Sequence, residues 1–165
     1  MAIDNLDSTL TAIKVAIVTA CGVLASFLGW RLIMLLIWIF LMGIDYASGT
    51  WAARLTGTWK SEMAREGIGH KGGMVLVVAV CAITDFIMLL ISQNLTHDIL
   101  PFEWPMAIFP IVTMWYIITE IGSIIENAIK MGAPIPAWLP KLLDATLKQM
   151  DAAGDAAVGS QIENE

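Results

Sequence analysis

Residues 72–92 read GGMVLVVAVCAITDFIMLLIS, an apolar run that a single charged residue, Asp85, interrupts. An α-helix needs about 20 mostly apolar residues to cross the hydrocarbon core of a bilayer. This stretch reaches that length without the regular polar positions of an amphipathic surface helix. It predicts a transmembrane helix, so lipid is the solvent in which this part of the chain folds.

The composition of the whole chain agrees with a membrane protein. Of 165 residues, 58% are hydrophobic and 15% are charged, with a mean hydropathy of +0.74, whereas average soluble domains carry about 25% charged residues. Nine scattered basic residues argue against nucleic-acid binding. Cys21 and Cys81 lie inside apolar runs and form no CxxC motif, which predicts plain packing residues and neither a disulfide framework nor a zinc site.

Three further segments are candidates for spanning helices. Residues 105–129, PMAIFPIVTMWYIITEIGSIIENAI, predict a helix over 106–129. The first 45 residues leave two alternatives, because 16 uncharged residues separate Lys14 from Arg31 and only 13 separate Arg31 from Asp45. One is a hairpin of helices 8–28 and 32–54 with a tight turn at 29–31, and the other is one long spanning helix preceded by an interfacial helix. The predicted fold class is therefore an all-α integral membrane protein with three to four transmembrane helices.

The loops predict the orientation. Basic residues occur in 45–71 and after the last span, whereas the loop 93–105 contains no lysine or arginine. Because cytoplasmic loops carry an excess of these residues, we expect 55–71 and the C-terminus in the cytoplasm and 93–105 outside. The initial hairpin would place the N-terminus inside as well. The chain is therefore expected to pass through the membrane several times.

The C-terminal part differs in character from the spans. Pro134, Pro136 and Pro140 break the helical pattern, and apolar residues then recur at helical spacing from Leu139 to Met150. This pattern predicts a short amphipathic cytoplasmic helix, followed by a disordered acidic tail. We therefore expect a transmembrane domain over 1–136 and a cytoplasmic segment over 137–165.

The sequence offers no catalytic or cofactor motif of weight. A G-x-G-x-x-G match at Gly67, Gly69 and Gly72 lacks the strand and βαβ unit of a dinucleotide site, and we interpret it as a flexible loop that leads into a helix. His70 and His97 are expected in loops without a second ligand at metal spacing. We expect no metal, no cofactor and no enzymatic activity.

Small residues and acids within the predicted spans carry the strongest signal. Pairs such as Gly43 with Ala47 and Gly49 with Ala53 follow the small-xxx-small pattern, which allows helices to pack closely in lipid, within one chain or between copies. Intramembrane acids such as Asp85 cost about 2.5–3.5 kcal/mol on insertion scales and face a bundle interior or water. We expect Asp85 and Glu120 at similar depth, with no lysine or arginine available there to neutralise them.

Four short motifs resemble the bacteriophage holin family, which includes toxin-secretion holins. The first is Asp45, Tyr46, Ser48 and Gly49, followed by Ala52 and Ala53. The others are Gly67, Ile68 and Lys71; then Glu120, Ser123, Ile124, Glu126 and Asn127; then Gly132, Pro134 and Pro136. The likeness covers about residues 35–150. It implies a small helical protein that oligomerises in the bacterial inner membrane, forms lesions that release an endolysin or toxin, and has no catalytic residues.

The residues also support two hypotheses about function. A polar seam of Asp45, Asp85 and Glu120 would be hidden at rest and line the opened assembly, and Glu120→Leu would then leave insertion intact but delay or abolish lysis. The alternative is a small ion channel or transporter subunit with Asp85 and Glu120 as its ion path. The candidate oligomerisation and pore residues are Asp45, Ser48, Gly49, Asp85, Glu120, Ser123 and Asn127. The expected partners are the lipid bilayer, further copies of the chain, and an endolysin or secreted toxin.

Overall fold

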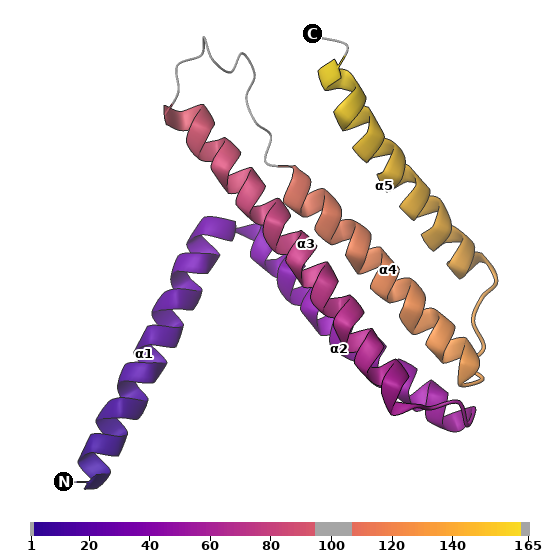
Figure 1. Ribbon diagram of the computed structural model, residues 1–165, viewed down its shortest axis with the longest axis horizontal. Helices are drawn as coiled ribbons and strands as arrows, with labels where there is room; N and C mark the ends of the chain where they lie inside the picture. Colours follow the sequence, from indigo (N-terminus) through magenta and orange to yellow (C-terminus); the bar gives the residue numbers. More distant parts are fainter. Residues whose placement is uncertain (1, 95–106, 163–165) are drawn as a thin grey trace. The chain divides into compact units, whose positions relative to one another are not determined.

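The structure is a computed structural model that describes residues 2–94 and 107–162, and all of its regular elements are helices (Figure 1). They are α1 (Ala2–Leu28), α2 (Trp30–Leu55), α3 (Ser61–Asn94), α4 (Ile108–Lys130) and α5 (Trp138–Ile162). The chain divides into a unit Met1–Leu36 and a larger unit Ile37–Glu165. In the larger unit α4 packs against α3 on one side and against α5 on the other (Figure 1).

Three of these helices are long and apolar enough to cross a membrane: α2, α3 and α4. The described part of α1 contributes a shorter apolar helix, Ser8–Thr19. Many large apolar side chains of the three long helices are exposed, among them Phe40 at 67% and Leu76 at 69%. This surface is suited to lipid contact. The prediction of an all-helical chain with at least three helices able to span a membrane is confirmed, and the break between 28 and 30 falls at Gly29, as expected.

The enclosed side of each spanning helix repeats every seven residues. The enclosed positions at this spacing are Trp38, Asp45 and Ala52 on α2, Lys71, Val78 and Asp85 on α3, and Thr113, Glu120 and Asn127 on α4. A spacing of seven keeps side chains on one stripe of a helix, because two turns contain about seven residues. The Trp38 and Tyr116 rings stack with 5.7 Å between their centroids. The three spans therefore have narrow enclosed stripes, and these stripes contain Asp45, Lys71, Asp85 and Glu120.

Two glycines end helices in the same way. Gly57 and Gly132 have φ values of 69° and 85°, which side chains disfavour and glycine adopts freely. After α4, the N–H groups of Gly132 and Ala133 donate to the carbonyl oxygens of Ile129 and Ala128 at 2.9 and 3.0 Å, which is the Schellman arrangement. This turn allows the chain to reverse direction before α5.

Two predicted boundaries were wrong. α3 begins at Ser61, eleven residues before the predicted 72, so Gly67, Gly69 and His70 lie on a helix and not in a loop. Met63, Ala64, Gly67 and Lys71 line one cavity wall at helical spacing, and this tertiary packing favours helix there. α5 continues to Ile162 instead of ending near Met150, in a stretch rich in alanine, the strongest helix former. His97 lies outside the described residues.

Candidate functional site

A buried ion network joins the three spanning helices, and Lys71 lies at its centre. The Lys71 ammonium donates to Glu120 Oε1 at 2.7 Å and to Oε2 at 2.5 Å, and it lies 3.0 Å from Asp45 Oδ2. The side chains of Lys71, Asp45 and Glu120 are only 17%, 18% and 3% exposed. One cation from α3 is therefore shared by a carboxylate of α2 and a carboxylate of α4.

Asn127, which follows Glu120 by seven residues or about two turns of α4, extends the network. Its Nδ2 donates to Asp45 Oδ1 at 3.0 Å and lies 3.1 Å from Ser48 Oγ, while the Ser48 hydroxyl donates to the Asp45 carbonyl at 3.1 Å. A Cβ atom at Gly49 would lie 3.3 Å from Asn127 Nδ2, closer than ordinary van der Waals contact. Gly49 is therefore small because the Asn127 amide approaches the α2 backbone at this point.

The expectation that no lysine or arginine could neutralise the intramembrane acids was wrong. Lys71 was assigned to the loop before the span, but it lies ten residues inside α3, whose first residue is Ser61. Its long apolar stem carries the charge toward the partner carboxylates. The sequence signal for the pairing of Lys71 with the two acids was its position directly before the apolar run 72–92.

Asp85 is as buried as Glu120, at 2% exposure, and its carboxylate binds backbone groups of another helix. Its carboxylate accepts hydrogen bonds from the N–H of Phe109 at 2.9 Å and of Ile108 at 3.4 Å. Pro110 has no N–H, and the Ile111 N–H donates to the Ala107 carbonyl at 3.1 Å. The N–H groups at the start of α4, which a helix leaves without internal partners, are thus accounted for from Ile108 to Ile111.

The predicted seam of three acids is therefore only partly correct. Asp45 and Glu120 do come together, but Asp85 lies at the start of α4, and Glu120 follows Ile108 by twelve residues, about 18 Å along the helix axis. The similar depth expected for Asp85 and Glu120 was wrong, because α4 begins beside Asp85 and not at the level of the end of α3. No group of three or more potential metal-ligating side chains occurs among the described residues.

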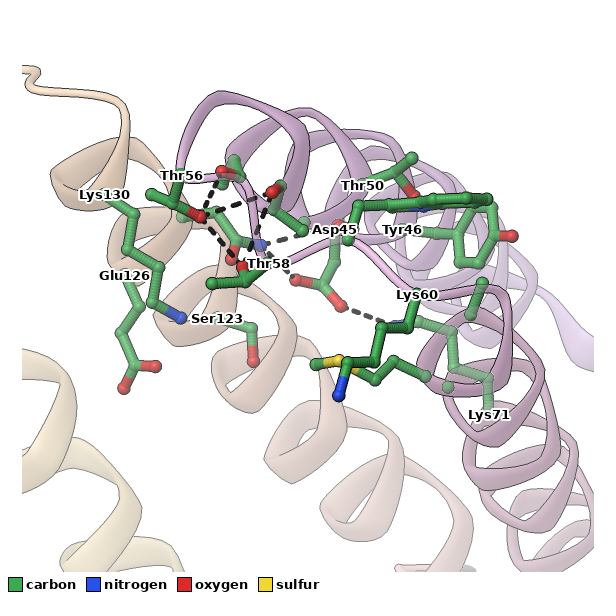
Figure 2. Close-up of a pocket in the computed structure, with 18 residues that line it drawn as sticks. Asp45, Tyr46, Thr50, Thr56, Thr58, Lys60, Lys71, Ser123, Glu126 and Lys130 are labelled. Atoms are coloured by element: carbon green, nitrogen blue, oxygen red, sulfur yellow. Dashed lines mark hydrogen bonds and ion pairs between the residues drawn. The ribbon is translucent and has the colours of Figure 1, made fainter.

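A cavity of about 630 Å³ adjoins the network where α2, the following turn, α3 and α4 meet (Figure 2). Asp45, Gly49, Lys71, Ser123 and Asn127 contribute to its wall. Ser123 thus lies beside the network, whereas Glu126 is exposed at the cavity edge. Lys60 and Lys130 bring further positive charge to this end of the bundle.

This end also has the features of a membrane interface. The Arg54 guanidinium lies over the Trp59 ring, 5.4 Å from its centroid. Tryptophan and basic side chains favour the boundary between hydrocarbon and water. The network thus lies between the apolar part of the bundle and a basic, aromatic end.

These features define a small helical membrane protein whose spanning helices are held together by buried charges. Its family is identified by comparison: the model of the bacteriophage holin family matches residues 22–148, and the chain belongs to that family. The resemblance drawn from the four motifs is confirmed. All four motifs lie within the matched residues.

Similar proteins add sequence likeness but no assigned activity. An uncharacterized protein of Halalkalibacterium halodurans is 32% identical over 111 residues, which cover 67% of this chain and 76% of that protein. Uncharacterized proteins of Listeria monocytogenes and Listeria innocua are each 31% identical over 99 residues, 60% of this chain and 61% of theirs. No solved structure matches the chain.

Proposed function

We propose that this protein oligomerises in the bacterial inner membrane and forms lesions through which an endolysin or a toxin passes, which leads to lysis of the host cell. The observation that carries the proposal is the holin family match over residues 22–148, together with three helices able to span a membrane. The chain has no catalytic role in this proposal, and it needs no cofactor. Its partners are lipid, further copies of itself and the released protein.

Self-association is supported by the free side of α2. Gly43 and Ala47 are exposed, and a Cβ added at Gly43 would meet no atom within 4 Å. Small residues four apart let two helix backbones approach closely in lipid. In contrast, Gly49 is occupied by Asn127 of the same chain. The small residues of α2 thus divide into an internal set and a set that offers a surface to another copy.

The ion network has a structural role in this proposal. Lys71 pairs with both Glu120 and Asp45 inside one chain, so the unit can insert and accumulate with each of these carboxylates beside a cation. Asp45, Ser48, Gly49, Glu120 and Asn127 fix the mutual register of α2 and α4. In this proposal the acids do not line the opened assembly. Their contacts hold α2, α3 and α4 of one chain together.

The proposed topology follows from the distribution of basic residues. The α2–α3 turn, which contains Lys60, lies in the cytoplasm, and the 93–105 segment lies outside. Single cysteines at positions 2, 58, 97 and 160, in a chain without Cys21 and Cys81, would be probed with a membrane-impermeant maleimide. Labelling at 97 without labelling at 58 supports this orientation, and the result at 2 decides between three and four spans.

The decisive functional test uses an endolysin in trans. The chain is expressed in a bacterium together with a cytoplasmic endolysin that has no export signal, and murein degradation and culture turbidity are followed. We expect abrupt lysis that requires both proteins. Loss of ion gradients without passage of the folded endolysin would refute lesion formation and favour a small channel.

The alternative of an ion channel that uses Asp85 and Glu120 gains little support from the geometry. Glu120 binds Lys71, and Asp85 binds the start of α4. The two acids are about 18 Å apart along α4 and each has a partner within the chain. An ion path would need to displace both sets of partners.

A further inference from the structure

The apolar helix α4 packs against α5, a helix that carries several charged residues. α5 runs back along α4 (Figure 1). The Trp115 Nε1–H donates to Asp151 Oδ1 at 2.9 Å. Trp115 is the eighth residue of α4 and Asp151 the fourteenth of α5, so this contact lies deep within a helix that is long enough to span a membrane.

The two sides of α5 have different chemistry. Leu139, Leu143, Leu147, Met150 and Gly154 are partly covered and recur every three or four residues, which places them on one helical face. The charged residues form a separate stripe that spans an arc of about 80° at about 100° per residue. This stripe contains Lys141, Asp144, Lys148, Asp151 and Asp155.

The residues of the charged stripe are exposed, and Asp151, at the edge of the stripe nearest the covered face, is the member that contacts α4. The side chains of Asp144 and Lys148 are 65% and 73% exposed, and they form an exposed ion pair at 2.8 Å. Charged side chains are costly in hydrocarbon and occur there facing a bundle interior or water. Within the described part of the chain, all residues of the charged stripe of α5 are exposed. α5 can therefore lie beside a membrane-spanning α4 only where its charged stripe meets water.

We propose that α5 lines the water-filled lumen of the lesion, with its leucine face on α4 and its charged stripe toward the lumen. This inference rests on the proposed function and adds which surface of the protein meets the passing cargo. A lesion exposes the apolar surface of the surrounding helices to water, and α5 covers that surface on α4. Because a closed membrane contains no such lumen, the α4–α5 pair forms when the lesion opens.

A cross-link between the two helices tests this arrangement. In a chain with Cys21→Ala and Cys81→Ala, the pair Trp115→Cys/Asp151→Cys places thiols where the structure has a direct contact. The matched control, Trp115→Cys/Gln149→Cys, places the second thiol on an exposed side of α5. Membranes are treated with a short bifunctional thiol reagent before and after the onset of lysis.

We expect the cross-linked fraction of the 115/151 pair to rise several-fold at lysis and that of the 115/149 pair to stay at background. Chains linked before lysis should release endolysin at least as early as unlinked ones. Equal linking of both pairs, no linking at lysis, or loss of lysis on linking would overturn the inference. If the unlinked cysteine-free chain releases no endolysin at all, it is the proposed function that fails.

A second measurement applies if the Trp115 variants do not insert. A small fluorophore on Leu143→Cys is exposed to iodide in water or to lipids with brominated acyl chains, in lysed membranes. We expect neither to quench it, because α4 covers this face of α5. Quenching by brominated lipid would place α5 on the membrane surface, quenching by iodide would place it free in solution, and either result overturns the proposal.

Discussion

Asp85 and Glu120 are the two acids buried in the spanning helices, and each is 2% exposed. Glu120 is neutralised by a full charge, the Lys71 ammonium, whereas Asp85 is bound by the N–H groups that begin α4. A helix start carries about half a positive charge, spread over several donors. An ammonium requires a charged partner, but a helix start requires only an acceptor oxygen. Substitutions at the two sites should therefore have different consequences.

The largest effect is expected for Lys71→Met. Both carboxylates then lose their cation, and removing one partner of a buried ion pair costs about 3–5 kcal/mol. We expect little folded protein in membranes and early thermal unfolding in detergent, measured by circular dichroism. The control Lys60→Met changes an exposed lysine of the adjacent turn and should unfold like the unmodified chain.

The double variant Lys71→Met/Glu120→Leu sharpens this result. It removes the cation together with its most buried partner and leaves Asp45, which retains its bond to Asn127. Replacing a buried ion pair with apolar groups is often nearly neutral. Recovery of most of the stability would confirm that the loss arises from uncompensated charge and not from lost packing of the lysine stem.

Two substitutions at Asp85 should distinguish the contribution of its charge from that of its hydrogen bonds. Asp85→Leu leaves the N–H groups of Ile108 and Phe109 without an acceptor, at about 1–3 kcal/mol for each unsatisfied group. Asp85→Asn keeps an acceptor oxygen for these N–H groups and loses the interaction of the carboxylate charge with the helix dipole, about 0.3–1 kcal/mol. Thermal unfolding should thus rank the asparagine variant close to the unmodified chain. An asparagine variant as unstable as the leucine variant would show that the charge itself is needed.

Glu120→Leu should be milder than the loss of Lys71. Lys71 keeps Asp45 as its partner at 3.0 Å, so the expected cost is that of one net hydrogen bond, about 1 kcal/mol. Insertion should remain intact and lysis should be delayed, followed as culture turbidity with a co-expressed endolysin. Unchanged timing would separate the ion network from the opening step.

The spanning helices could be predicted from the sequence because hydropathy indicates which segments are apolar enough to lie in lipid. The spans at 32–54 and 106–129 agree with α2 and α4 within a few residues, and Asp45, Ser48, Gly49, Glu120 and Asn127 do gather near one another. The role of Lys71 was missed because hydropathy treats a lysine as the end of a span, although its stem can bring the charge back inside. The binding of Asp85 to the start of α4 was missed because the N–H groups of Ile108 and Phe109 belong to the backbone, and a pattern of side chains does not reveal backbone donors.

A smaller effect should distinguish the two glycines of α2. Gly49→Ala places a Cβ 3.3 Å from Asn127 Nδ2, so the amide must move and weaken its bond to Asp45, an overpacking cost of about 1 kcal/mol. Gly43→Ala meets no atom within 4 Å and should leave the stability of the monomer unchanged. If Gly43 belongs to the surface between copies, its alanine variant should instead alter lysis timing. Unfolding in detergent and lysis timing together separate the two effects.

The smallest effect extends the comparison to an exposed ion pair, Lys148 and Asp144 on α5. The hydrogen bond to Asp144 raises the pKa of Lys148 above its ordinary value. A raised pKa of a basic group means that the pair stabilises α5 fully below the unfolded-state pKa, and that this contribution is lost as pH rises through the folded-state value. Both side chains are mostly exposed, and such pairs contribute little. The helical signal of the unmodified chain should therefore fall by only a small amount as pH rises through the raised pKa of Lys148, and Asp144→Asn should remove that fall. A large fall that persists in Asp144→Asn would come from another group, since in that variant the carboxylate that raises the pKa is gone.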